Sequence, residues 1–337
     1  MNDYLSKDVE YFKEVFPYVD VIKGTSFLIT GGTGLIGSTL VKCLLALQKN
    51  ISITIPVRNR EKALNIFGCE NQYLSIVKCD LNNYLEELNG NFDYVVHLAS
   101  PTSGQYITQY PLETYELTIE TTRSLLRYAN NHNVKGLVYV SSLEYYGQNS
   151  DDRFITEDFL GYLDMSSTRT AYPMGKRAAE YLCFSFAKEY GVPVKIARLT
   201  QTFGAGVSKE DNRVFAQFAR SIIDKVNIVM HTKGESAKPY CYTIDCVSAL
   251  LYILLKGSSG EAYNVANQST YISIRGLAEF FRDNFCPTVK VIVEEHPEMG
   301  YAPVTKLNLS AEKLMALGWK PNMSLKDMCG KLIESMK

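Results

Sequence analysis

Apolar residues gather in short runs along the first two thirds of the chain, and amphipathic stretches separate these runs. The amphipathic stretches at residues 35–48, 111–131 and 173–190 predict helices. The apolar runs predict buried strands at residues 26–30, 51–57, 74–80, 93–100, 134–142 and 193–199. This alternation of strand and helix is typical of an α/β fold, in which helices cover both faces of a parallel sheet.

The pattern changes after Phe203, where strand and helix no longer alternate regularly. The predicted elements beyond this point are a helix at 211–224, a strand leading into a helix at 238–257, a short strand at 261–267 and a helical end at 311–335. A further amphipathic helix is predicted at residues 1–22, with Tyr11, Phe12, Val15, Phe16 and Val19 on one side. No low-complexity linker divides the chain, so we expect its second half to pack on the first.

A glycine-rich turn lies between the first predicted strand and the first predicted helix of the sheet. Its spacing, Gly31-x-x-Gly34-x-x-Gly37, lets the chain turn sharply and lets backbone N–H groups approach a pyrophosphate at the helix N-terminus. A glycine repeat in this position is a strong indication of dinucleotide binding. The residues expected to touch the dinucleotide here are Gly31, Thr33, Gly34, Leu35, Ile36 and Gly37.

With this turn, the pattern predicts a doubly wound parallel sheet of the Rossmann type and three parts of the chain. Residues 1–23 are a helical extension, and residues 24–203 are the dinucleotide-binding domain. Residues 204–337 form mainly a smaller, substrate-binding cap, with a return to the core near residues 238–268. The substrate is expected in the cleft between the two larger parts.

The end of the second strand decides between NAD and NADP. An acidic residue there bonds the ribose 2′-hydroxyl, whereas an arginine accommodates a 2′-phosphate. Arg58 stands at this place and favours NADP, and the alternative is a solvated arginine beside the unphosphorylated ribose of NAD. The other residues expected along the cofactor are Asp80 and Leu81 on the adenine side, and Leu98, Ala99 and Ser100 near the phosphate and ribose.

Three side chains predict proton transfer at the same edge of the sheet. Tyr172 and Lys176 are four residues apart at a helix start, so they share a face, and the lysine is expected to lower the pKa of the phenol. Ser142 ends the fifth strand and is placed to hydrogen-bond the same substrate oxygen as Tyr172. The string VSSLEYYGQ adds a carboxylate, Glu144, with Leu143 between it and the serine, and indicates chemistry on a sugar-like substrate.

Composition narrows the remaining classes of function. The formal net charge is −1, so nothing marks the surface for nucleic acid or an anionic membrane, and the longest apolar runs are strand-sized. The 8 cysteines contain no CxxC pair and the 4 histidines show no ligand spacing, so we expect no metal and no disulfide. With no secretory leader in the sequence, we expect a reduced, cytoplasmic protein.

These motifs resemble the extended short-chain dehydrogenase/reductases, the NAD-dependent nucleotide-sugar epimerases and dehydratases. The resemblance spans residues 24–335, and VHLASPTS, RTAYPMGKRAAE and DNRVFAQF are very similar to strings of the UDP-glucuronate decarboxylase branch. It implies a catalytic triad of Ser142, Tyr172 and Lys176 with Glu144 as an extra carboxylate. It further implies cofactor contacts from Thr118, Tyr172 and Lys176, and substrate contacts from Thr102, Ser142, Gln201, Arg213 and Lys238.

The resemblance makes Leu143 informative about the reaction. The 4,6-dehydratases of the family typically have an Asp-Glu pair after the catalytic hydroxyl, and the Asp protonates the leaving C6 hydroxyl. Leu143 has no proton to donate, so this dehydration is not expected. The decarboxylases keep the Glu and lack the Asp, because a β-keto acid loses carbon dioxide without an acid at C6.

The expected function is therefore C4 oxidation followed by decarboxylation, of the UDP-glucuronate decarboxylase type, with NAD or NADP. A nucleotide-sugar 4-epimerase or 4-keto-sugar reductase remains the alternative, and a dinucleotide-sensing protein without catalysis is a remote one. Four positions depart from the family pattern: Arg58 replaces an Asp, Thr118 and Gln201 replace Asn, and Lys238 replaces an Arg. The resemblance also implies a homodimer formed through the helices near residues 111–131 and 173–190.

Overall fold

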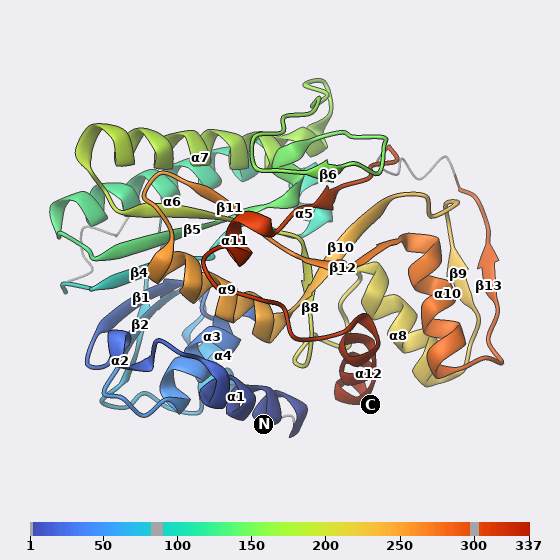
Figure 1. Ribbon diagram of the computed structural model, residues 1–337, viewed down its shortest axis with the longest axis horizontal. Helices are drawn as coiled ribbons and strands as arrows, with labels where there is room; N and C mark the ends of the chain where they lie inside the picture. The colour runs from blue at the N-terminus through green and yellow to red at the C-terminus, as the bar shows by residue number, and fades with distance from the viewer. Residues whose placement is uncertain (1–2, 82–89, 297–302) are drawn as a thin grey trace.

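The computed structural model describes residues 3–81, 90–296 and 303–337, and a seven-stranded sheet lies at its centre (Figure 1). The strand order is β11-β7-β5-β4-β1-β2-β3, and every neighbouring pair is parallel. The strands are β1 (Ser26–Thr30), β2 (Ser52–Val57), β3 (Leu74–Lys78), β4 (Tyr94–His97), β5 (Gly136–Ser142), β7 (Val194–Leu199) and β11 (Ala262–Val265). This confirms the predicted doubly wound parallel sheet.

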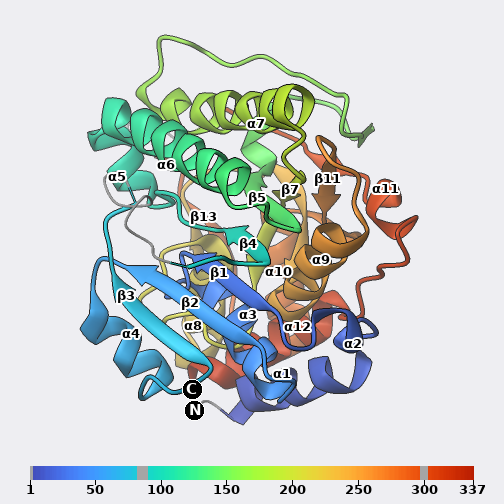
Figure 2. The same ribbon diagram turned by 90° about the vertical axis from the view of Figure 1, so that its left-hand side faces the viewer.

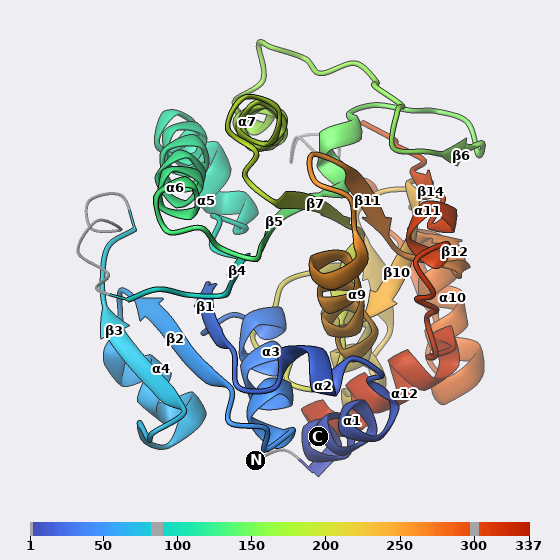
Figure 3. The ribbon, with the colours of Figure 1, turned by 60° about the vertical axis from the view of Figure 1, so that its left-hand side comes forward.

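Helices cover both faces of this sheet, which is why its middle strands are apolar throughout. On one face lie α6 (Pro111–Asn131) and α7 (Ala171–Tyr190), side by side (Figure 2). On the other face lie α3 (Leu35–Ala46) and α9 (Thr243–Lys256), with α4 (Arg60–Phe67) beneath β2 and β3 (Figure 3). Between β1 and β4 the strand order reverses direction, and in open α/β sheets ligands bind at this point, beyond the carboxyl ends of the strands.

The chain leaves the large sheet after β7 and builds a smaller part beside it (Figure 1). There β8 (Gln201–Phe203), β10 (Ala237–Tyr242) and β12 (Asn267–Ser273) form a three-stranded sheet, and β9 (Ile228–Met230) pairs with β13 (Val291–Val293). Its helices are α8 (Val214–Asp224) and α10 (Ile274–Phe285), followed by α11 (Glu312–Met315) and α12 (Leu325–Met336). Between β10 and β12 the chain returns to the large sheet to form α9 and β11.

Shorter elements surround the carboxyl ends of the strands. They are α5 (Gly104–Gln109), the 3-10 helices η2 (Leu143–Tyr146) and η3 (Thr168–Thr170), and the strand pair β6 (Phe154–Ile155) and β14 (Asn308–Leu309). The 3-10 helix η2 directly follows β5, so the string VSSLEYYGQ turns sharply where the sheet ends.

The predicted N-terminal helix is two helices in the structure, α1 (Asp3–Val15) and α2 (Val19–Ile22). Pro17 interrupts them, because proline lacks an N–H and the residue before it avoids the helical conformation. Phe12 and Phe16 are buried as predicted, but Val15 is 46% exposed. The apolar face of α1 packs on α3 and α9.

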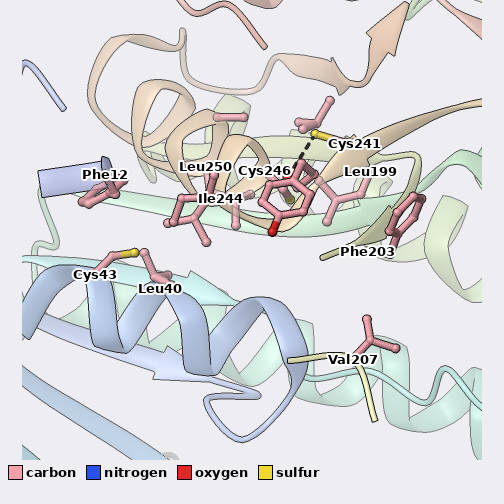
Figure 4. Packing of buried hydrophobic residues seen from close by; sticks show 14 of the residues in the cluster. Phe12, Leu40, Cys43, Leu199, Phe203, Val207, Cys241, Ile244, Cys246 and Leu250 are labelled. Carbon is pink, nitrogen blue, oxygen red and sulfur yellow. Dashed lines mark hydrogen bonds between the residues drawn. The ribbon is translucent and has the colours of Figure 1, made fainter. Parts of the chain in front are cut away.

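Figure 4 shows this packing from close by. Leu40 and Cys43 of α3 lie opposite Ile244 and Leu250 of α9, and Phe12 of α1 closes the same cluster. All eight cysteines are free, and those that are buried pack as small apolar side chains: Cys43, Cys79, Cys183, Cys241, Cys246 and Cys329.

The described residues also bear on membrane and metal-binding classes of function. None of the helices described for this chain is long and apolar enough to cross a membrane. Within residues 3–81, 90–296 and 303–337, His, Cys, Asp and Glu side chains form no group of three or more that could hold a metal ion.

Candidate active site

The glycine turn between β1 and α3 forms a cradle that only glycines allow. Gly31 has a φ of +69°, and a Cβ added there would lie 2.8 Å from the backbone N of Ala99. A Cβ on Gly37 would collide with the carbonyl oxygen of Gly31. Gly34 is the N-cap of α3 and no side chain caps the helix, so the first N–H groups of α3, from Leu35 onward, are available to an anion. The turn therefore fits a dinucleotide pyrophosphate.

The segment after β4 lies against this cradle and is fixed by a buried histidine. His97 Nδ1 lies 2.7 Å from Thr30 Oγ1, which also accepts a hydrogen bond from the N–H of Ala99 at 3.2 Å. Burial, and then the charge of Lys176, lower the pKa of His97 to about 3, so the ring is neutral. The sequence placed His97 only as part of the string HLAS along the cofactor, and its three-dimensional neighbours show that it holds this segment in place.

Ser100 supplies a second observation that fits a bound ligand. Its hydroxyl oxygen is buried and has no hydrogen-bond partner within the described part of the chain. A buried hydroxyl without a partner costs free energy, and a ligand that hydrogen-bonds to it removes that cost. Ser100 follows Leu98 and Ala99 beside the glycine turn, where cofactor contacts were predicted.

The residues predicted to choose the cofactor lie at the carboxyl ends of β2 and β3. Arg58 follows the last residue of β2 and is exposed. Asp80 and the half-buried Leu81 follow β3, which pairs with β2 through Val57 and Lys78. The arginine is close enough to Tyr106 to lower that phenol's pKa, although a hydrogen bond with Glu113 raises it more.

The structure brings Ser142, Tyr172 and Lys176 together where β5 ends and α7 begins. The Ser142 hydroxyl ends β5, caps η2 by accepting the N–H of Glu144 at 3.2 Å, and is hydrogen-bonded to Tyr172. Lys176 Nζ donates to the carbonyl of Val140 at 2.9 Å and lies 5.6 Å from the centre of the Tyr172 ring. Each side chain is thus held in place by a backbone or neighbouring group, an arrangement compatible with the predicted proton transfer.

The electrostatics of Tyr172 differ from the sequence prediction. Burial and the charge of Glu144 raise the pKa of Tyr172 well above its usual range, while the hydrogen bond to Ser142 opposes them. Burial lowers the pKa of Lys176 to about 8, against the opposing charge of Glu180. The prediction considered only the attraction of Lys176 and omitted the loss of water around the buried phenol, which is the largest effect on its pKa.

Glu144 belongs to a cluster of charges on the substrate side of the triad. Its Oε1 lies 3.5 Å from Nη2 of Arg169, and both side chains are partly exposed. The pKa of the half-buried Lys238 is lowered, mainly by burial. The negative charge of Glu144 opposes this effect, and the positive charge of Arg169 adds to it, so the three charged groups lie near one another. Sequence reasoning missed Arg169, although it stands three residues before Tyr172.

Leu143 does not point into this cluster. It is buried with Ile155, Leu307 and Leu309 in an apolar cluster under η2. A carboxyl group at this position would lose its water without gaining a charge partner in that cluster. The side chain next to Glu144 is therefore a packing residue, which agrees with the prediction that it donates no proton.

Thr118 lies at the contact of α6 with α7 rather than on an open surface. Its hydroxyl donates to the carbonyl of Thr114 at 2.8 Å, and a Cβ added to Gly175 would lie 3.3 Å from its Cβ. Besides its predicted contact with the cofactor, Thr118 thus has a packing role, because its small side chain allows α6 and α7 to approach closely. An asparagine, which the family usually has here, is larger.

The remaining predicted substrate residues occupy different settings. Gln201 of β8 pairs with Tyr240 of the neighbouring strand β10. Gln201 therefore lies near Lys238, which is also in β10. Arg213 forms a fork with Asp211, its Nε lying 3.0 Å from Oδ1 and 3.1 Å from Oδ2. Thr102 is exposed just before α5. Arg213 is thus paired with Asp211, and its contact with the sugar or its diphosphate stays a prediction.

The geometry agrees with what comparison with known proteins finds. The sequence model of the NAD dependent epimerase/dehydratase family matches residues 27–266, from β1 to the end of β11. The chain belongs to this family. The matched region includes the glycine turn and the triad.

Individual relatives are similar along most of the chain. UDP-glucuronic acid decarboxylase 6 of Arabidopsis thaliana is 26% identical over 307 residues, which are 89% of this chain and 85% of the relative. The solved UDP-glucose 4-epimerase of Thermotoga maritima has a TM-score of 0.80 at 21% identity, over 92% of this chain and 98% of that one. The UDP-glucuronic acid 4-epimerase of Bacillus cereus in complex with NAD has a TM-score of 0.75 at 20% identity, with the coverage being 92% and 98%. The solved relatives show the shared fold, so the reaction must be argued from the site itself.

Proposed function

We propose that this chain oxidises the sugar of a nucleoside-diphosphate uronic acid at C4 and decarboxylates it, in the manner of a UDP-glucuronate decarboxylase. The observation that carries the proposal is that Leu143 and Glu144, the first two residues of η2, have different environments. Glu144 acts electrostatically on both Tyr172 and Lys238, whereas Leu143 is packed in an apolar cluster. Curated relatives named UDP-glucuronic acid decarboxylases support the same reaction.

The side chains of the triad perform the proton transfers of this reaction. The phenolate of Tyr172, a minor form at neutral pH, takes the proton of the C4 hydroxyl while Ser142 hydrogen-bonds the same oxygen. A nicotinamide dinucleotide held by the glycine turn would supply the acceptor for the C4 hydride and the hydride for the final reduction. The C5–C6 bond of the resulting β-keto acid then breaks, carbon dioxide leaves, and the electron pair moves to the C4 oxygen, where Ser142 and Tyr172 hold the enolate. Glu144, or a water that it orients, supplies the proton to C5.

The charges around Glu144 give the site its preference for an acidic sugar. Lys238 and Arg169 place two cations beside one carboxylate. A substrate carboxylate would pair with these cations, and its departure as carbon dioxide would remove the charge they bind. Lys238 offers a point charge rather than the planar fork of the arginine usual in the family, so recognition of the anion is less directional.

The cofactor proposed is NAD or NADP, held by the glycine turn, by Ser100 and by the residues that follow β2 and β3. NAD is supported by the family and by the Bacillus cereus relative solved with NAD. NADP is supported by Arg58, whose guanidinium can pair with a 2′-phosphate.

A panel of substrates tests the proposed reaction. The protein would be incubated with NAD or NADP and with nucleoside-diphosphate hexoses and uronic acids, and products would be identified by mass spectrometry and NMR. We expect a pentose product from a uronic acid and its loss in Glu144→Gln. Glu279→Gln, an exposed carboxylate on α10, serves as the control with unchanged activity.

Other products would point to other reactions. A 4-keto-6-deoxy sugar formed at an enzymatic rate would show that the interpretation of Leu143 is wrong. C4 epimers or reduced sugars alone, with Glu144→Gln nearly silent, would establish the 4-epimerase or 4-keto-sugar reductase instead. Cofactor binding without turnover of any sugar would favour the dinucleotide-sensing alternative.

We also propose that the chain forms a homodimer through α6 and α7. The outward face of α7 exposes Tyr181 and Phe184, at 69% and 51%, and these rings stack with their centres 6.4 Å apart. Large exposed aromatic residues gathered on one helix are typical of a surface that another protein covers. This face lies opposite the sheet, so a dimer formed there would leave the substrate side open.

A further inference from the structure

We propose that Glu180 and Arg198 form a buried positioning pair, which keeps a negative charge beside Lys176 and holds the segment that carries Glu144. The inference rests on the proposed function, because it assumes that Lys176 and Glu144 serve the reaction. Neither Glu180 nor Arg198 takes part in the steps described above.

The pair has the geometry of an ionised carboxylate held by a guanidinium fork. Arg198 Nε lies 3.1 Å and 3.0 Å from the two carboxylate oxygens of Glu180, and its Nη2 lies 2.7 Å from Oε2. Both side chains are 5% exposed. The Ser141 hydroxyl also donates to Oε1, which gives the first serine of VSSLEYYGQ a function distinct from that of Ser142. Burial raises the pKa of Glu180, and these charge-assisted bonds from Arg198 and Ser141 oppose that effect by favouring the carboxylate.

Glu180 acts on the catalytic lysine because it stands one helical turn beyond it. Glu180 and Lys176 share a face of α7, and the carboxylate raises the lysine's pKa against the effect of burial. The other described groups around the ammonium are titratable but uncharged at neutral pH: His97, Tyr139, Tyr172 and Cys183. Among the described residues for which a charge effect on Lys176 is resolved, Glu180 is thus the one that carries a negative charge.

Arg198 extends the same pair to the other side of the site. Its guanidinium carbon lies 3.6 Å from the centre of the Tyr145 ring, and its Nη1 donates to the hydroxyl of Tyr146 at 3.0 Å. The Tyr146 hydroxyl in turn donates to Asn264 of β11 at 2.6 Å. Tyr145 and Tyr146 directly follow Glu144 in η2, so the arginine fixes the turn that presents this carboxylate.

The pair therefore links three elements whose relative positions matter for the proposed reaction. Glu180 belongs to α7 with the tyrosine and lysine of the triad, Arg198 to β7, and the two tyrosines to η2. A buried ion pair adds little stability compared with apolar residues of similar size. Its position between the general base and the extra carboxylate fits a positioning role better than a purely stabilising one.

Titration of Lys176 tests the electrostatic half of the inference without any substrate. The protein would be labelled with ¹³C at lysine Cε, and the Lys176 resonance would be identified by its absence in Lys176→Arg. In Glu180→Gln we expect this resonance to titrate about 1–3 pH units lower than in the wild type. The matched control is Glu189→Gln, an exposed carboxylate farther along α7, in which the resonance should not move.

A second variant keeps the test valid if Glu180→Gln, which leaves Arg198 buried without its partner, does not fold. Glu180→Gln combined with Arg198→Met removes both charges together. We expect the same downward shift of the Lys176 titration in this double variant. An unchanged titration in a folded variant of either kind would overturn the inference. Because no sugar is present, this outcome is separate from any failure of the proposed decarboxylation.

The pH dependence of hydride transfer provides the functional readout. Reduction of bound cofactor by the sugar that the substrate panel identifies would be followed at 340 nm across a pH range. Loss of the lysine charge at neutral pH makes the Tyr172 phenolate less stable, so the rising limb of the rate should move to higher pH in the double variant. An equal loss of rate at every pH would indicate a merely structural role and overturn the proposal.

Discussion

Each residue that we assign to proton transfer is also held by a contact that does not involve the substrate. Ser142 caps η2 through the N–H of Glu144, and Lys176 is tied to the carbonyl of Val140. Tyr172 is buried against both. These contacts fix the side chains before a ligand arrives, which is the condition for efficient general acid–base catalysis.

Tyr172→Phe should abolish turnover while leaving dinucleotide binding intact. The phenol transfers the proton, whereas the glycine turn holds the pyrophosphate, so the two functions separate. Loss of a general acid–base group lowers rates by about 10²–10⁴-fold. The measurement is the rate of product formation together with cofactor titration by calorimetry. A variant that keeps near-normal activity would refute the assignment of the triad.

Arg58 should make NADP bind more tightly than NAD. It directly follows β2, where the sequence predicts the 2′-phosphate, and a pairing with that phosphate would be a charge-assisted contact. Calorimetric titration of the cofactor-free protein with both dinucleotides measures the difference, and Arg58→Ala should reduce it. Tighter binding of NAD would instead show that Arg58 is a solvated neighbour of the ribose.

At the scale of elements, α1 is held to the core by apolar packing and by hydrogen bonds. Its apolar residues pack on α3 and α9, and Asp8, which is buried, accepts hydrogen bonds from Tyr242 at 2.6 Å and from Lys331 of α12 at 2.5 Å. The helix lies outside the region matched by the family model, which begins at residue 27. It therefore belongs to the cooperative structure of this chain in addition to the shared fold.

Replacing Phe12 with alanine should destabilise the whole protein. The ring is 1% exposed and stacks on Phe16 with their centres 5.0 Å apart, so its removal leaves a cavity. Such substitutions cost about 3–5 kcal/mol of unfolding free energy. Denaturant unfolding measures the loss, with Val15→Ala as the control, since Val15 is 46% exposed on the same helix. Equal midpoints for the two variants would mean that α1 is not part of the cooperative core.

At the scale of the whole molecule, the proposed substrate side and the proposed dimer face lie apart. The glycine turn and triad lie at the carboxyl ends of the strands, while the exposed aromatic residues of α7 face away from the sheet. A dimer would therefore bury α6 and α7 without covering the site, although it would stiffen the helix that carries Tyr172.

Charge on that face should separate the dimer. Tyr181→Glu with Phe184→Glu would place two carboxylates in the proposed apolar contact, and we expect a monomer by sedimentation or light scattering. Val226→Glu, which alters a residue 52% exposed after α8, should leave the oligomeric state unchanged. A wild-type protein that is monomeric at micromolar concentration would contradict the proposal.

The sequence by itself determined the features that are local or periodic. The alternation of apolar runs gave the order of strands and helices, because a buried parallel strand needs apolar residues on both faces. The spacing of Gly31, Gly34 and Gly37 identified the turn, and the backbone at Gly31 and Gly37 leaves no room for a Cβ. The spacing of Tyr172 and Lys176 predicted a shared face, because it equals one turn of a helix.

Only the tertiary structure decided what surrounds these residues. Burial raises the pKa of Tyr172, Asp211 occupies the guanidinium of Arg213, and Arg169 joins Glu144. Arg198 reaches Glu180 from another element, 18 positions away in the sequence. Burial and charge depend on neighbours that are distant along the chain, and no spacing rule connects them. The sequence thus supplied the groups that we propose for the chemistry, and the packing of the fold determined their surroundings and their partners.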